Sequence, residues 1–296
     1  MKWRRGRRSR NVIDRRGAGG FGGGGFSGPV RIGGGIGFPA LLVLAVVLLL
    51  NGGLGGSSVT IDGPLDDLPG IGEPAQAPSR GADPDQRLFE FVNFIHDDVQ
   101  DFWADTFAES GRNYRRADLI VFDSATTSAC GQATEAIGPH YCPADENVYL
   151  DLGFFVDLRD RFGAPGDFAQ AYVLAHEIGH HVQHLTGISD QMRQEQKANP
   201  EDANDLSVRL ELQADCLAGV WAFTTYVRKM LEEGDLEEGL RAAAAVGDDR
   251  IQQQATGRID PESWTHGSSE QRMRWFTTGF QDGNPNECTT FTAEEL

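Results

Sequence analysis

A five-residue motif of the form H-E-x-x-H, residues 176–180, constrains this chain more than any other feature. It lies in an apolar stretch with helical spacing, residues 171–185. Because four residues make about one helical turn, His176 and His180 share one face and can bind the same metal ion. Glu177 lies at the edge of that face, where it can reach a metal-bound water. The stretch must therefore form a helix with one face on a core and the other on a cleft.

The predicted helix has an apolar face and recognisable ends. Its apolar residues lie opposite the two histidines: Ala171, Leu174, Ile178, Val182 and Leu185. Asp167 is expected to cap the N-terminus, with Gln170 completing a capping box, and Gly187 is expected to end the helix. Gly179 lies between the histidines, where a small residue lets another segment approach.

A second helix supplies what the first motif lacks. A hydrolytic zinc site has three protein ligands and one position open to water. Glu211 and Asp215 are one turn apart on a predicted helix, residues 206–232, so they share a face. Glu211 is the candidate third ligand beside the two histidines. Asp215 is expected to support the bound cofactor by accepting the spare N–H of a liganding imidazole. The two helices together predict one catalytic Zn²⁺ ion.

The segments that carry these residues, 175–183 and 211–219, resemble a bacterial family of neutral zinc metallopeptidases. The similarity covers most of residues 84–291 and includes segments 141–145 and 266–269. Members of that family are membrane-anchored proteins with a gluzincin-like site, and they are distantly similar to M48 peptidases. The resemblance implies a minimal gluzincin domain that hydrolyses peptide bonds.

The same resemblance implies the roles of individual residues. Zinc is bound by His176, His180 and Glu211, and Glu177 is the catalytic base. A zinc-bound water has a pKa of about 7, and the glutamate passes its proton to the leaving amine. The substrate is then a peptide or protein.

The oxyanion that develops during hydrolysis needs a donor besides zinc. Tyr149 is one catalytic candidate because it lies on a predicted edge strand, where a peptide can pair. His266 is the other candidate because it precedes a predicted helix near the C-terminus. Each residue also has a plain structural interpretation: Tyr149 as an aromatic packed on a small sheet, and His266 as a loop or capping residue.

The charge distribution predicts a membrane anchor. Residues 1–31 contain nine Lys or Arg and one acidic residue, whereas the remainder contains 17 basic and 43 acidic residues. No charged residue occurs between Ile32 and Ile61, and residues 33–54 supply the roughly 20 apolar residues of a membrane-spanning helix. The positive charges before it place the N-terminus in the cytoplasm and the domain outside. A cleaved signal peptide is the alternative, although the preceding tail is long for one.

Four parts are therefore expected: a disordered Arg/Gly-rich tail (1–31), a transmembrane anchor (33–54), a flexible Gly/Pro linker (55–82) and a zinc metallopeptidase domain (84–296). The domain is predicted to be α+β and mostly helical, with a small zincin-like sheet. Strands are expected at 117–122 and 147–152, and helices at 88–103, 168–185, 190–197, 206–232, 236–246 and 269–280.

The four cysteines form no C-x-x-C pair, which disfavours a cysteine-rich zinc site. Outside the cytoplasm they predict two disulfides, with three possible connectivities. The short loop between Cys130 and Cys142 favours their pairing, which leaves Cys216 with Cys288. Four free thiols are the alternative.

Two other functions remain open at this point. The chain could be a catalytically silent envelope protein that binds zinc or a partner through a peptidase-like fold. It could also be a cytosolic RNA-associated protein led by its Arg/Gly tail, although the acidic body disfavours nucleic acid as a partner. Glu177 separates the first alternative from an enzyme, because a silent fold does not need it.

Overall fold

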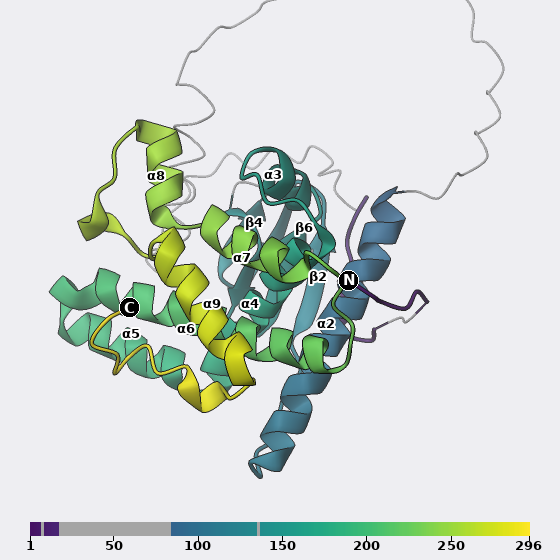
Figure 1. Cartoon of the computed structure of the whole chain (residues 1–296), viewed down its shortest axis with the longest axis horizontal. Coiled ribbons are helices and arrows are strands. Elements are labelled where there is room, and N and C mark those ends of the chain that lie inside the picture. The colour runs from purple at the N-terminus through teal and green to yellow at the C-terminus, as the bar shows by residue number, and fades with distance from the viewer. Residues whose placement is uncertain (7–8, 18–83, 135–136) are drawn as a thin grey trace, which may run out of the picture.

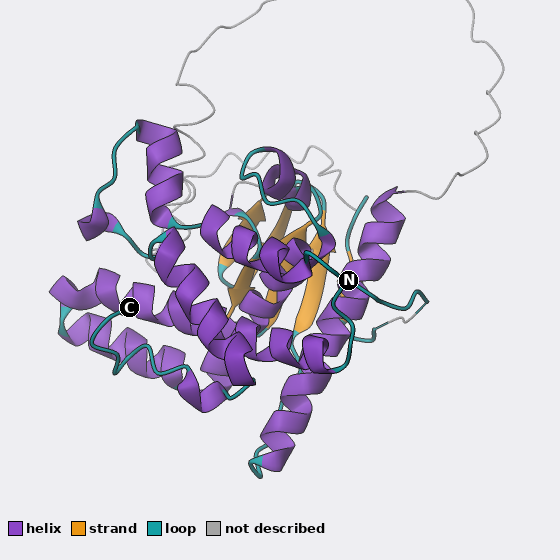
Figure 2. Ribbon diagram, viewed as in Figure 1, coloured by secondary structure: helices purple, strands orange, loops and turns teal. Residues whose placement is uncertain are grey.

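A small sheet with helices on one face forms the body of the computed structural model, which describes residues 1–6, 9–17, 84–134 and 137–296 (Figures 1 and 2). Within these ranges the strands are β1 (Val12–Asp14), β2 (Asp118–Phe122), β3 (Ala125–Ser128), β4 (Gly131–Thr134), β5 (His140–Cys142) and β6 (Asn147–Asp151). The helices are α2 (Pro84–Glu109), α3 (Phe154–Asp160), α4 (Asp167–Thr186), α5 (Ile188–Ala198), α6 (Ala203–Val227), α7 (Asp235–Ala245), α8 (Asp248–Thr256) and α9 (Ser269–Asp282).

The main sheet has the strand order β1-β2-β6-β5, with β5 antiparallel to β6 and the other pairs parallel. Successive side chains alternate between its faces. Leu119 and Val121 of β2 and Val148 and Leu150 of β6 lie in the main core under the helices. The opposite face carries a smaller apolar cluster, which includes a residue of the β3–β4 hairpin: Ile120, Phe122, Ala133, Cys142 and Tyr149. The sheet therefore separates two apolar layers, and the helices cover one of them.

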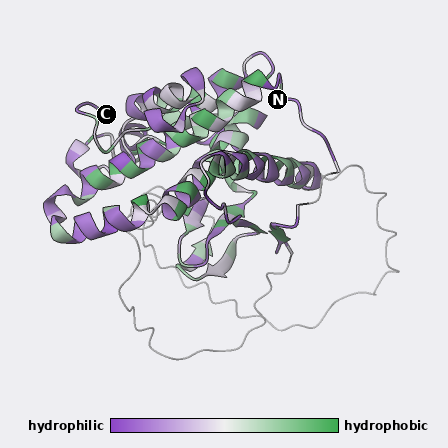
Figure 3. Cartoon of the chain, turned by 90° about the horizontal axis from the view of Figure 1, so that it is seen from below, coloured by the Kyte–Doolittle hydropathy of each residue, from purple (hydrophilic) through white to green (hydrophobic). Residues whose placement is uncertain are grey.

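Helix α4 lies centrally and contacts α2, α6, α7 and β5. Figure 3 shows hydrophobic and hydrophilic residues interspersed along the helices, as expected of helices that bury one side. On α4, Leu174 and Ile178 are fully buried, as their spacing predicts. Gly179 lies on the side that meets α6, where an added Cβ would be 3.0 Å from the carbonyl oxygen of Ala214. The prediction that Gly179 admits another segment is confirmed, and that segment is α6, which carries Glu211 and Asp215.

Helices α6 and α9 cross even more closely, and glycines make the approach possible. A Cβ at Gly219 would lie 2.0 Å from the carbonyl oxygen of Phe276, and one at Gly279 would lie 1.9 Å from that of Cys216. Real Cβ atoms are not found at such distances from backbone atoms. The crossing holds α9 against the same helix that carries Glu211.

The predicted class, α+β and mostly helical with a small sheet before the motif helix, is confirmed. The predicted helices correspond to α2, α4, α5, α6, α7 and α9, and the predicted strands to β2 and β6. Strands β1, β3, β4 and β5 and helices α3 and α8 were not predicted. These elements are short, and several of them gain their buried neighbours only from distant parts of the chain.

The N-terminus of α4 differs from the predicted capping box. Gly166 precedes the helix, and Asp167 is its first residue and makes no capping hydrogen bond. Its carboxylate instead lies 2.6 Å from the α-amino group of Met1. Glu238 of α7 accepts a hydrogen bond from the backbone N–H of Phe168 and so takes over part of the capping role. The helix ends as predicted, at Gly187 in the left-handed conformation.

Residues 1–6 and 9–17 belong to the folded domain. Met1 is buried in the main core, and the Trp3 ring contacts Phe91 of α2 with ring centroids 5.5 Å apart. Strand β1 pairs with β2 along its edge. These residues were predicted to belong to a disordered tail, 1–31, whose remaining residues lie outside the described ranges, as does the predicted linker, 55–82.

The prediction of a single-pass membrane protein is wrong. Its anchor, residues 33–54, lies outside the described residues, and no helix in the described ranges is long and apolar enough to cross a membrane. The pairing of β1 with β2 gives the physical reason. One spanning helix between these strands would put them on opposite sides of a membrane, yet they share one sheet. The predicted cytoplasmic N-terminus with an extracytoplasmic domain does not fit this fold.

Both predicted disulfides are confirmed. Cys130 bonds to Cys142, the last residue of the edge strand β5, and Cys216 of α6 bonds to Cys288 in the C-terminal segment. The described residues include no free cysteine. The second disulfide fastens the C-terminal segment to the helix that carries Glu211 and Asp215.

Candidate metal centre

Two neighbouring helices bring three metal-binding side chains together. The Nε2 atom of His176 lies 3.2 Å from one carboxylate oxygen of Glu211, and Nε2 of His180 lies 3.4 Å from the other. One ligand atom from each of the three residues lies within 4.8 Å of the others. Zinc–ligand bonds of about 2.0–2.1 Å separate tetrahedral ligands by about 3.3 Å. The side chains therefore fit one tetrahedral ion, and zinc's preferred nitrogen and oxygen donors are present.

Asp215 fixes the orientation of the first histidine. Its Oδ1 atom lies 2.8 Å from Nδ1 of His176 and also accepts the hydroxyl hydrogen of Tyr172. Arg272 of α9 donates to both oxygens of Asp215, at 2.8 and 3.0 Å. The imidazole must donate from Nδ1 to this carboxylate, which leaves the lone pair of Nε2 free for a metal.

The charges at the centre favour a cation. Burial lowers the pKa of His176, but Asp215 and Glu211 overcome this effect and raise it to about 10. Burial opposes the charged form of Glu211, but the neighbouring histidines hold its pKa well below the usual range. A basic imidazole and an ionised carboxylate are both good donors to a divalent metal ion.

Glu177 and His266 are the other two residues that the sequence placed at this site. Glu177 follows His176 in α4 and is buried, with 7% of its surface exposed. His266 lies in the loop before α9, and its Nδ1 atom is 3.1 Å from a carboxylate oxygen of Asp248. Burial lowers the pKa of His266, but Asp248 and Glu211 reverse the effect and raise it. Glu211 therefore favours the charged form of His266, and His266 in turn lowers the pKa of Glu211.

Asp248 holds the His266 loop in place. The carboxylate accepts hydrogen bonds from the backbone N–H groups of Thr265, His266 and Gly267 at 2.8, 2.7 and 3.1 Å. Four hydrogen bonds to one buried carboxylate, counting that of the imidazole, leave the loop little freedom. Asp248 is also the first residue of α8, so the start of that helix and the His266 loop are held at one point.

Tyr149 lies away from the metal centre. It is on β6, an interior strand of the sheet, whereas β5 is the edge strand on that side; the predicted edge position is wrong. Its side chain belongs to the apolar cluster on the sheet face opposite the helices. The hydroxyl donates to Asp145 at 2.8 Å, and the ring stacks on His140. The structural interpretation of this tyrosine, packing on a small sheet, is the one that fits.

Sequence reasoning missed Tyr172 and Arg272. Tyr172 lies one turn before His176 and two before His180, so helical spacing could have placed it on the metal face. Arg272 has no comparable signal, because a single arginine in an amphipathic helix is usually exposed. Only the packing of α9 on α6 brings its guanidinium to Asp215, 57 residues away in the sequence.

The family comparison agrees with this centre. The model of the family described as "Putative neutral zinc metallopeptidase" matches residues 1–291. The chain belongs to this family. The match begins before β1, so it includes the N-terminal segment that packs on the domain.

Two similar proteins are both described as uncharacterized. The chain is 44% identical over 300 residues to "Uncharacterized protein YpfJ" of Escherichia coli (strain K12), a match that covers 98% of this chain and 99% of that protein. It is 47% identical over 194 residues to "Uncharacterized protein Rv2575" of Mycobacterium tuberculosis (strain ATCC 25618 / H37Rv), covering 62% and 65% of the two chains. No solved structure matches. The family name implies zinc and a peptidase activity, whereas the similarity to M48 peptidases stays a prediction.

Proposed function

We propose that this protein is a zinc-dependent metallopeptidase in which His176, His180 and Glu211 bind the metal and Glu177 is the general base. The observation that carries the proposal is the spacing of the three ligand side chains, whose closest nitrogen and oxygen atoms lie 3.2 and 3.4 Å apart. Glu177 is buried and directly follows His176 on α4. The family membership supports the same reaction class.

Bound zinc would supply a water of lowered pKa and polarise the carbonyl of the scissile peptide. Glu177 would accept the proton of the attacking water and transfer it to the nitrogen of the leaving amine. Asp215 would keep His176 in the tautomer that binds the metal, with Tyr172 and Arg272 holding the carboxylate in place. The peptide bond breaks by addition of one water, so no further co-substrate is needed.

His266 would donate a hydrogen bond to the oxyanion of the tetrahedral intermediate. Asp248 occupies its Nδ1 atom and supports the protonated form, which leaves Nε2–H as the donor. A positively charged donor stabilises a developing negative charge better than a neutral one. Tyr149 has no part in this proposal, because its side chain lies on the other face of the sheet.

The substitution Glu177→Gln tests the enzyme assignment. It retains the size of the side chain and removes the base, so we expect zinc to stay bound at one equivalent. Hydrolysis of a quenched fluorescent peptide library should fall by at least about 100-fold, the usual contribution of a general base. Glu270→Gln, a change of the same kind at an exposed position on α9, is the control.

The results of these measurements distinguish an active peptidase from a catalytically silent zinc-binding protein. Wild-type protein that binds zinc but cleaves no member of the library would favour the silent alternative. A Glu177→Gln variant with full activity would remove the glutamate from the mechanism. Metal analysis of Glu211→Ala tests the third ligand, because undiminished zinc would assign that role elsewhere, with Asp215 as the next candidate.

A further inference from the structure

His180 is held by different hydrogen-bond partners from those of His176. Nδ1 of His180 lies 2.8 Å from Oε1 of Gln183, one turn further along α4. Nε2 of Gln183 donates to the carbonyl oxygen of Leu210 at 2.7 Å and to Oε1 of Gln213 at 3.1 Å. Nε2 of Gln213 in turn donates to the carbonyl oxygen of Cys288 at 2.9 Å. Two buried amides therefore connect the imidazole to the C-terminal segment.

The two backbone carbonyls fix the direction of this connection. A carbonyl oxygen can only accept, so the amide nitrogen of Gln213 must face Cys288 and that of Gln183 must face Leu210. The amide oxygen of Gln213 then faces Gln183, and the amide oxygen of Gln183 faces the imidazole. His180 must therefore donate from Nδ1, which leaves its Nε2 lone pair toward Glu211 and the metal position. The backbone carbonyls of Leu210 and Cys288 therefore set the orientation of both amides.

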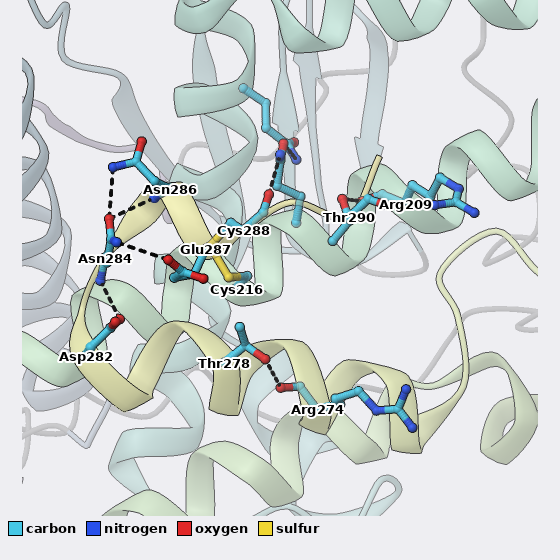
Figure 4. The surroundings of a disulfide bond; sticks show 12 residues. Arg209, Cys216, Arg274, Thr278, Asp282, Asn284, Asn286, Glu287, Cys288 and Thr290 are labelled. Atoms are coloured by element: carbon cyan, nitrogen blue, oxygen red, sulfur yellow. Dashed lines mark hydrogen bonds between the residues drawn. A yellow bond between two sulfur atoms is a disulfide. The ribbon is translucent and has the colours of Figure 1, made fainter. Parts of the chain in front are cut away.

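The end of the connection is itself anchored on α6. Cys288 is bonded to Cys216, and two residues further on the Thr290 hydroxyl donates to the carbonyl oxygen of Arg209 at 2.7 Å (Figure 4). Arg209 donates back to the carbonyl oxygen of Thr290 at 2.6 Å. With Gln213 between them, three consecutive points along one side of α6 hold the C-terminal segment.

We propose that Gln183 and Gln213 are positioning residues that set the tautomer and ring orientation of His180, with the disulfide-anchored carbonyl of Cys288 as their fixed end. This proposal rests on the proposed role of His180 as a metal ligand. It assigns the C-terminal segment and its disulfide a role in metal binding that goes beyond holding the fold together. His176 is oriented by a charged carboxylate, whereas His180 is oriented by neutral amides.

The first test reads the tautomer in metal-free protein. The ¹⁵N chemical shifts of an imidazole distinguish Nδ1–H from Nε2–H, and the His180 signals are identified by their loss in His180→Gln. Wild-type protein should show a proton on Nδ1 of His180, whether or not Nε2 also carries one toward Glu211. Gln183→Met should give a mixture of tautomers, and Gln213→Met should shift the ratio in the same direction by less, because Leu210 still holds Gln183. An unchanged ratio in both variants would overturn the proposal.

The second test measures zinc affinity by competition with a chromophoric chelator. Gln183→Met should weaken binding by about 10-fold, a typical loss when a group that supports a metal ligand is removed. Gln213→Met should weaken it less. Gln196→Met is the matched control, because Gln196 of α5 bonds to Ala203 and Ser207 and does not contact the connection. Equal affinity for zinc in all three variants and the wild type would contradict the positioning role.

A third test separates the two disulfides. Cys216→Ser with Cys288→Ser should lower zinc affinity in the direction of Gln213→Met, whereas Cys130→Ser with Cys142→Ser should not. Equal effects of the two pairs would remove the disulfide from the proposal, while circular dichroism reports whether each variant is folded. Failure of the wild type to bind zinc would contradict the proposed function and the metal-binding role of this connection. The tautomer measurement needs no metal, so it would still test separately whether the two amides orient His180.

Discussion

Asp215 and Arg272 form an ion pair that is entirely enclosed by the protein, and the same carboxylate orients a histidine of the metal centre. The two side chains are 0% and 3% exposed, and the guanidinium lies 2.8 Å from Oδ2 of Asp215. Burial opposes the charged form of Asp215, but Arg272 and His176 overcome it and lower the pKa. Fold and site thus depend on one carboxylate.

The substitution Asp215→Asn should weaken both the stability of the fold and the binding of zinc. It leaves the charge of Arg272 buried without its counter-ion, which typically destabilises a protein by about 3–5 kcal/mol. Zinc affinity should fall by about 10- to 100-fold, because an amide holds His176 less firmly. Urea unfolding and chelator competition measure the two effects. Asp157→Asn, which breaks the more exposed pair with Arg161, should cost less than about 1 kcal/mol; similar losses in both variants would contradict this account.

The substitution Asp248→Asn should change the pH dependence of catalysis. Asp248 raises the pKa of His266, so the protonated donor persists to higher pH than it would alone. Without the carboxylate the pKa falls, and the alkaline limb of kcat/KM should move to lower pH. Glu211 and Arg272 also act on this histidine, in opposite directions, and remain in the variant. A pH profile of peptide hydrolysis that is merely scaled down, with its alkaline limb unmoved, would exclude His266 as the protonated donor.

Alanine substitutions at Gly279 and Gly179 should differ in their effect on Tm, because the helices pack more closely at Gly279. Alanine at Gly279 would place its Cβ 1.9 Å from the carbonyl oxygen of Cys216, whereas at Gly179 the nearest atom is 3.0 Å away. Either change gains up to about 1 kcal/mol of helix propensity. Gly279→Ala should nevertheless lower the Tm clearly, and Gly179→Ala should lower it less but weaken zinc binding by separating α4 from α6. Equal Tm values for the two variants would show that the crossings adapt.

The substitution Trp3→Ala tests whether the N-terminal segment is part of the domain. Trp3 packs on Phe91 and Phe94 of α2, so its truncation should lower the free energy of unfolding of the whole domain. Ile13→Ala is the control, because Ile13 is in the same segment but 40% exposed. Thermal unfolding followed by circular dichroism measures both. A segment that detaches freely would give the same Tm for both variants and the wild type.

Sequence reasoning succeeded where an arrangement of side chains depends on spacing along one helix. His176 and His180 are four residues apart, and so are Glu211 and Asp215, so a single helical turn specifies each pair. The disulfide pairing could be predicted because Cys130 and Cys142 lie close in sequence. The predictions that failed concerned contacts between distant segments: the edge position assigned to Tyr149 and the capping role of Asp167.

The prediction of a membrane anchor failed for a related reason. An uncharged stretch with positive charges before it is typical of a spanning helix, and the local pattern contains no sign of where residues 1–6 and 9–17 go. Their place became visible only in the pairing of β1 with β2 and in the burial of Met1. Composition indicates whether a segment can lie in lipid or in water. Strand pairing shows which segments lie on the same side of a membrane.

The sequence by itself determined which polar side chains share a face on each of the two helices, because helical periodicity places them there without help from the rest of the chain. Tertiary structure alone decided how those side chains are held. Arg272 reaches Asp215 through the glycine crossing of α6 and α9, Asp248 holds the His266 loop, and the C-terminal segment ends the connection to His180. A buried polar group must form a hydrogen bond with whichever partner the fold places beside it. When that partner is far away in the sequence, no local sequence pattern reveals it.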